Sequence, residues 1–74
     1  MQVKVKLFAT FRKGRFKEQD MFFPEETCVG RVIDELRIAR KELGIVFLNG
    51  HATDSENMLQ DRDTLSIFPM VGGG

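Results

Sequence analysis

The 74-residue sequence has few of the side chains on which most enzymes depend. It contains a single cysteine, Cys28, and a single histidine, His51. One cysteine cannot form an internal disulfide, which is typical of a cytosolic protein. So few ligands and bases exclude a cysteine–histidine metal cluster and a nucleophile–histidine–acid set. We therefore do not expect a stand-alone enzyme.

Net charge and long apolar runs are also missing. The 11 basic and 11 acidic residues balance, so no net field would attract the phosphates of a nucleic acid. No stretch reaches membrane-spanning length, and the basic-apolar layout of a signal peptide is absent. We expect a cytoplasmic protein without nucleic-acid or membrane partners. One basic cluster is interpreted as a solvated hairpin loop, namely Arg12, Lys13, Arg15 and Lys17.

What the sequence does contain is the pattern of one small domain. A chain this short buries only about 60% of its unfolded surface, so its core must pack efficiently. Alternating apolar residues predict a half-buried strand over residues 2–8, with its valines and Leu7 facing inward. A turn follows in which Gly14 takes a positive φ, and a less regular strand spans residues 15–23.

A helix is predicted after these strands. Its apolar stripe consists of Val29, Val32, Ile33, Leu36, Ala39 and Leu43. The helix begins near Val29 and ends between Ile38, which lies off the stripe, and Gly44. Thr27 is the predicted N-cap, because a hydroxyl accepts a backbone N–H better than the thiol of Cys28 does.

The C-terminal half reads as strands and turns. Residues 45–48 form a short strand, and Asn49-Gly50 is a strong hairpin signal before a short returning strand near residues 51–53. A turn over residues 61–63 leads to the last strand, residues 64–69. The order is β-β-α-β-(β)-β, an α+β fold in which one helix covers one face of a mixed four- or five-stranded sheet. If the first and last strands pair in the middle, the fold is the ubiquitin-like β-grasp.

Three glycines, Gly72, Gly73 and Gly74, follow this strand pattern. Glycine loses the most entropy on ordering, so we expect a flexible tail of residues 72–74 after a domain of residues 1–71. A frayed end is one interpretation of such a tail. The other is that a partner handles the C-terminal carboxylate, because glycines can thread a narrow slot and let the backbone approach a reacting group.

Four segments resemble the motifs of one family. Residues 5–12 (VKLFATFR) resemble its opening strand, V-x-L-F-A-x-x-R, and residues 28–36 (CVGRVIDEL) resemble its helix start, T-V-G-D-L-x-x-x-L. Residues 48–50 (LNG) resemble its V-N-G turn, and residues 61–74 (DRDTLSIFPMVGGG) resemble its ending, D-G-D-x-V-x-I-F-P-P-V-x-G-G. Over nearly its whole length the chain is similar to the MoaD/ThiS-like sulfur carriers. One departure is Met70 in place of the second proline, which should loosen the approach to the tail.

The resemblance implies a carrier that others act upon. The carboxylate of Gly74 would be ionised and a poor electrophile, so a ubiquitin-activating-type (MoeB/ThiF-like) enzyme would use ATP with Mg to join it to AMP. Sulfur from a persulfide would then leave a thiocarboxylate, which donates sulfur within a sulfur-accepting synthase subunit. Residues 69–74 reach about 20 Å when extended, enough to enter a deep active site. The partners would recognise Met70, Val71, Gly72 and Gly73, and the chain itself would bind no cofactor or metal.

The resemblance leaves the pathway open. A molybdopterin- or tungstopterin-type cofactor is the leading interpretation, and thiamine-pathway sulfur carriage is a variant with the same chemistry. A ubiquitin-like modifier would use the same activated Gly74 to form an isopeptide with a lysine. A docking module with an inert tail is the fourth alternative.

Docking is expected on the sheet face that no helix covers. Phe8, Phe47 and Phe68 alternate with residues predicted to face the core: Leu7, Leu48 and Ile67. In a β-grasp sheet their strands are neighbours, so the rings would form one partner-binding patch rather than wrap into the core. Cys28 is interpreted as a buried, inert thiol rather than a sulfur-handling one, and His51 as a loop residue rather than an acid or base.

Overall fold

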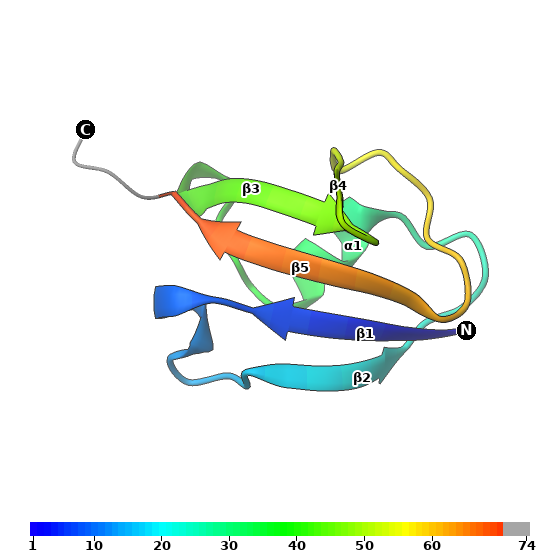
Figure 1. The fold of residues 1–74 in the computed structure, drawn as a ribbon, viewed down its shortest axis with the longest axis horizontal. Helices are drawn as coiled ribbons and strands as arrows, with labels where there is room; N and C mark the ends of the chain where they lie inside the picture. The colour runs from blue at the N-terminus through cyan, green and yellow to red at the C-terminus, as the bar shows by residue number, and fades with distance from the viewer. Residues whose placement is uncertain (71–74) are drawn as a thin grey trace.

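The computed structural model describes residues 1–70, in which five strands form one sheet with a single α-helix, α1 (Val29–Glu35), across one face (Figure 1). The two short 3-10 helices are η1 (Ala9–Arg12) and η2 (Arg40–Glu42). The strands are β1 (Gln2–Leu7), β2 (Glu18–Phe22), β3 (Leu43–Leu48), β4 (His51–Ala52) and β5 (Asp63–Pro69).

The sheet has the order β2-β1-β5-β3-β4. The central strands β1 and β5 are parallel, and all other neighbours are antiparallel. The first and last strands therefore pair in the middle, which confirms the predicted β-grasp. Because β1 and β5 run in the same direction, their carboxyl ends lie at the same edge of the sheet (Figure 1). We call this the carboxyl edge.

The core lies between the sheet and α1. Alternation in β1 and β5 directs every second side chain toward the helix, and Leu7, Leu65 and Ile67 are fully buried as predicted. The remaining buried apolar residues are Val3, Val5, Phe11, Phe23, Val29, Val32, Ile33, Ile38, Val46 and Leu59. Of these core residues, Phe11 belongs to η1, an element that the sequence pattern did not predict.

The helix is shorter than predicted. It ends at Glu35, because Arg37 adopts a left-handed conformation (φ 59°) and closes a Schellman-type turn. The N–H of Ile38 donates to the carbonyl of Ile33 at 3.2 Å, and the side chain of Ile38 returns to the core. The predicted end between Ile38 and Gly44 was therefore wrong, since a left-handed arginine carries no sequence signal.

The predicted N-cap was also wrong. Cys28 occupies the N-cap position without a side-chain bond, while the hydroxyl of Thr27 donates to the carbonyl of Pro24 at 2.7 Å. Carbonyls of the loop before β5 take over the capping role. The N–H groups of Val29 and Gly30 donate to backbone carbonyls of that loop at 2.9 and 2.8 Å, respectively. A long-range contact has thus replaced the local cap that sequence spacing suggested.

The predicted turns are present. Asn49 (φ 52°) and Gly50 (φ 85°) both have positive φ and join β3 to β4 as a two-residue hairpin. Gly14 (φ 71°) turns the chain between β1 and β2, and Arg62 (φ 72°) turns it into β5. Strand bounds differ by a few residues, most of all in β2, which is shorter than predicted.

Candidate functional site at the carboxyl edge

Three phenylalanine rings meet on the sheet face opposite α1. Phe8 and Phe68 are stacked, with ring centroids 4.1 Å apart and planes inclined by 10°. Phe47 meets Phe68 edge-on, at 5.8 Å and 89°. All three side chains are half-buried. We call them the aromatic patch. The clustering agrees with the expectation from alternation, while the role of the rings in partner binding stays a prediction.

Strand register explains how the patch forms. Leu7 pairs with Ile67 across the parallel strands, so Phe8 and Phe68 each follow a buried residue by one position and lie side by side. Phe47 pairs with Ser66, two positions before Phe68, which places both rings on the same face of the sheet. The core-facing neighbour of Phe47 is chiefly Val46, which is 5% exposed. Leu48, which we expected in the core, is only partly buried.

An arginine completes the patch. The guanidinium of Arg12 lies 5.3 Å from the ring centroid of Phe8, and its Nε donates to the carbonyl of Leu7 at 2.7 Å. From sequence, the basic cluster that includes Arg12 is interpreted as a solvated loop, and neither contact is predicted. The signal was available in the four-residue spacing from Phe8 to Arg12, which returns the side chain over the ring through η1.

A small hollow of about 150 Å³ borders the aromatic patch. It is lined by Lys6, Phe8, Arg12, Lys17 and Glu18. Three of these side chains are cationic and one is anionic, and the carboxylate of Glu18 lies 3.7 Å from Lys4 as well. The rim of the patch therefore carries a local excess of positive charge, although the net charge of the whole chain is zero.

The C-terminal end of β5 lies at the carboxyl edge (Figure 1). The last described residue, Met70, directly follows β5. Its side chain is 66% exposed, and its N–H donates to the carbonyl of Glu42 at 2.8 Å. Proline has no N–H to make this bond, so methionine brings a backbone tie at the point where we expected it to loosen the chain. The predicted tail residues Val71, Gly72, Gly73 and Gly74, and the expected flexibility of the glycines, lie outside the described residues.

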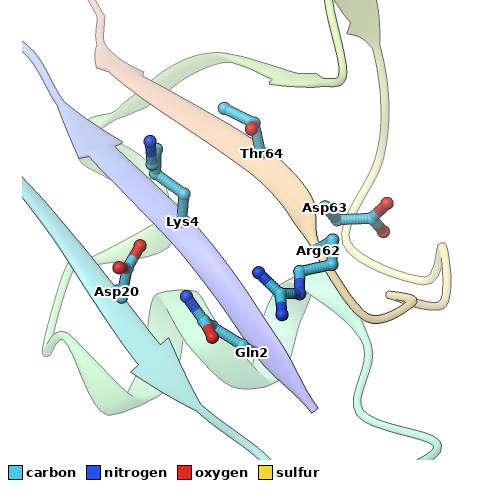
Figure 2. Close-up of a pocket in the computed structure, with 6 residues that line it drawn as sticks. All are labelled: Gln2, Lys4, Asp20, Arg62, Asp63 and Thr64. Carbon is cyan, nitrogen blue, oxygen red and sulfur yellow. The ribbon is translucent and has the colours of Figure 1, made fainter.

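A second, larger hollow of about 350 Å³ lies away from the predicted site (Figure 2). It is at the other end of the same sheet face, where Lys4 lies between Asp20 of β2 and Thr64 of β5. Figure 2 shows Arg62 and Gln2 closing one side of it. Cations and carboxylates alternate along this wall, so the hollow presents no field of one sign.

Neither candidate reactive side chain joins the aromatic patch. Cys28 is half-buried rather than buried, and its backbone bridges to Met58. His51 is exposed and belongs to β4, not to a loop. Within residues 1–70, no group of three or more histidine, cysteine or acidic side chains could hold a metal ion. No helix in that part of the chain is both long and apolar enough to cross a membrane.

A comparison with protein families identifies the family to which this chain belongs. Residues 5–74 match the family model of the ThiS family. The chain belongs to the ThiS family. This confirms the resemblance to the MoaD/ThiS-like sulfur carriers, which are carrier proteins rather than enzymes. No curated protein sequence matches the chain.

Solved structures share the fold over 96–100% of this chain. A Pyrococcus furiosus protein assigned as subunit 1 of a molybdopterin converting factor is 28% identical, with a TM-score of 0.78 over 96% of this chain and 99% of its own. SAMP1, a small archaeal modifier protein of Haloferax volcanii, has a TM-score of 0.78 at 22% identity over 100% of both chains. A protein–protein complex of subunits 1 and 2 of the Helicobacter pylori molybdopterin-converting factor includes a chain with a TM-score of 0.69, 21% identity and 100% coverage of both. The last two likenesses concern the fold alone.

Proposed function

We propose that this ThiS-family chain carries sulfur as a thiocarboxylate on Gly74 and donates it in the synthesis of a molybdopterin-type cofactor. The observation that carries the proposal is the aromatic patch at the carboxyl edge, next to Met70, from which the glycine tail continues. An apolar face beside the tail lets a partner hold the domain while the tail enters its active site.

The chemistry requires a poor electrophile to be activated. The carboxylate of Gly74 attacks the α-phosphate of ATP in an adenylating partner, giving an acyl-adenylate and pyrophosphate. The outer sulfur of a persulfide then attacks the acyl carbon and expels AMP, which forms an acyl disulfide. A second thiol attacks the partner's sulfur in that disulfide, forms a new disulfide with it, and releases the thiocarboxylate as the leaving group. The chain supplies only the acyl group, the tether and the docking face.

Two partners follow from this proposal. One is the ubiquitin-activating-type enzyme that forms the adenylate, and the other is a synthase subunit that accepts the sulfur. The Helicobacter pylori complex supports the second, because a chain of the same fold is seen there with a subunit 2. The Pyrococcus furiosus protein supports the molybdopterin-type pathway, because it is assigned as subunit 1 of a molybdopterin converting factor and is 28% identical to this chain over nearly the full length of both.

Intact-mass analysis of the protein from its native cell tests the carrier role. We expect a fraction of the chain to show the mass gain of one oxygen-to-sulfur exchange, located by fragmentation at the terminal glycine. The same spectra show at which glycine the mature chain ends. Isopeptide conjugates to other proteins without any exchange would instead establish a modifier.

Deletion of the gene tests the pathway. We expect cells without the chain to lose molybdopterin and to keep their thiamine, and a plasmid copy should restore the molybdopterin. Loss of thiamine with normal molybdopterin would move the chain to the thiamine pathway and leave the carrier chemistry intact.

A further inference from the structure

The backbone of β3 lies close against the end of β5. Leu43 pairs with Pro69, and the register shifts between Leu43 and Val46. One residue before β3, the carbonyl of Glu42 accepts the N–H of Met70 at 2.8 Å. These are the last backbone contacts of the described chain before residues 71–74.

Gly44 lies inside this irregular segment, where no side chain would fit. A Cβ at position 44 would stand 2.7 Å from the carbonyl carbon of Pro69 and 2.9 Å from the nitrogen of Met70, and it would overlap the carbonyl oxygen of Pro69. Real Cβ contacts essentially never fall below 3.0 Å. The atoms it meets are backbone, so no side chain can rotate away. Gly44 does not have a positive φ. A glycine is therefore required at this position because a side chain has no room, and not because of the backbone conformation.

For the proposed carrier, this contact matters because the reacting group lies a short distance further along the chain. Only four residues, Val71 to Gly74, separate Met70 from the reacting carboxylate of the proposed carrier. Four residues span at most about 14 Å, so they cannot compensate for a large displacement of Met70. A displacement of about 1 Å in a reacting group can lower a rate by about 100-fold.

We propose that Gly44 is a positioning residue for the carrier reaction. By having no side chain, Gly44 lets β3 approach Pro69 and hold Met70 in the place from which the tail enters the partner. This inference rests on the proposed function. Gly44 is not part of the aromatic patch, so it should govern how the tail is presented once the partner is bound, and not how tightly the partner binds.

The test compares Gly44→Ala with Gly14→Ala. Gly14 is a matched control, because it has a positive φ that strains alanine, yet a Cβ there meets nothing within 4 Å. Each variant is mixed with the MoeB/ThiF-like adenylating enzyme of the same organism and Mg-ATP, and pyrophosphate release is followed. For Gly44→Ala we expect kcat to fall about tenfold or more while KM stays within about twofold. Gly14→Ala should keep both constants near the wild-type values.

A second measurement does not depend on activity. Amide hydrogen exchange should show that Met70 loses protection in Gly44→Ala and keeps it in Gly14→Ala, since only the first variant separates Met70 from Glu42. If wild-type protein is not adenylated at all, the proposed function fails, while this exchange experiment still tests the contact at Gly44.

A third variant covers the case in which Gly44→Ala does not fold. One glycine inserted between Met70 and Val71 leaves residues 1–70 and the terminal V-G-G-G sequence unchanged, but shifts the tail relative to its starting point. We expect a lower kcat with an unchanged KM. A folded Gly44→Ala protein that is adenylated at the wild-type rate overturns the inference, as does an inserted glycine without effect on kcat.

Discussion

At the scale of single residues, Arg15 does more than a charge count suggests. Arg15, assigned from sequence to a solvated loop, reaches the C-terminus of α1. Its Nε donates to the carbonyl of Leu36 at 2.9 Å, and its Nη2 donates to that of Arg37 at 3.2 Å. These carbonyls have no hydrogen-bond donor within the helix. The guanidinium provides the donors and so ties the first hairpin to the end of α1.

Replacing Arg15 should therefore destabilise the fold. Because the side chain is solvent-exposed, we expect Arg15→Ala to lower the free energy of unfolding by only about 1 kcal/mol, measured by urea denaturation. Lys13→Ala is the control, since it removes the same charge from the same loop and should change stability by less than about 0.5 kcal/mol. Equal losses in both variants would show that charge, and not the bonds to α1, is responsible.

Two adjacent residues of β5 should separate stability from binding. Ile67 is fully buried, so Ile67→Ala should open a cavity and cost about 2–5 kcal/mol in urea denaturation. Phe68→Ala removes a half-buried ring from the aromatic patch and should cost less stability. In calorimetric titration with the adenylating partner, it should weaken binding by more than about 1 kcal/mol. A Phe68→Ala protein that binds normally but unfolds as readily as Ile67→Ala would place Phe68 in the core instead.

At the scale of elements, periodicity predicted the strands well and the helix only in part. Alternation located β1 and β5 because both have one buried face, which imposes a strict period of two. The apolar stripe continued past α1, since Leu43 belongs to β3 yet falls at helical spacing. Ile38, which is off the stripe but buried, was the sign that the helix had already ended. Which distant backbone or side chain satisfies a helix end is a property of the tertiary fold and cannot be seen in local spacing.

The β3–β4 turn also carries a tertiary contact. Besides its positive φ, Asn49 donates from Nδ2 to Asp63 at 2.9 Å and accepts from the N–H of Thr64 at 2.8 Å. Asn49→Gly keeps the turn conformation but removes both bonds, so we expect a loss of about 1–2 kcal/mol in thermal or urea unfolding. If Asn49→Gly is as stable as the wild type, conformation alone accounts for asparagine at this position.

At the scale of the whole molecule, parallel pairing in the centre of the sheet links fold to function. It brings the ends of β1 and β5 to one edge, so that Phe8 lies beside Phe68 just before the tail begins. Sequence periodicity places each ring on a face but cannot state which strands are neighbours. The family motifs supplied that neighbour relation. The tie between Met70 and Glu42 was invisible to both, because it joins backbone atoms of distant segments.

The division between a packed domain and a reacting tail leads to the final prediction. The hydrophobic core of the described residues runs from Val3 to Ile67, so one alanine added after Gly74 should leave the free energy of unfolding unchanged within about 0.5 kcal/mol. The same addition should abolish adenylation, because the carboxylate would then sit on a residue whose Cβ obstructs a slot shaped for glycine. Deleting Gly74 is the informative contrast, since Gly73 becomes a new terminal glycine and weak activity should survive on a shorter tether. Normal adenylation of the extended chain, measured by pyrophosphate release, would mean that the reacting carboxylate is not that of Gly74.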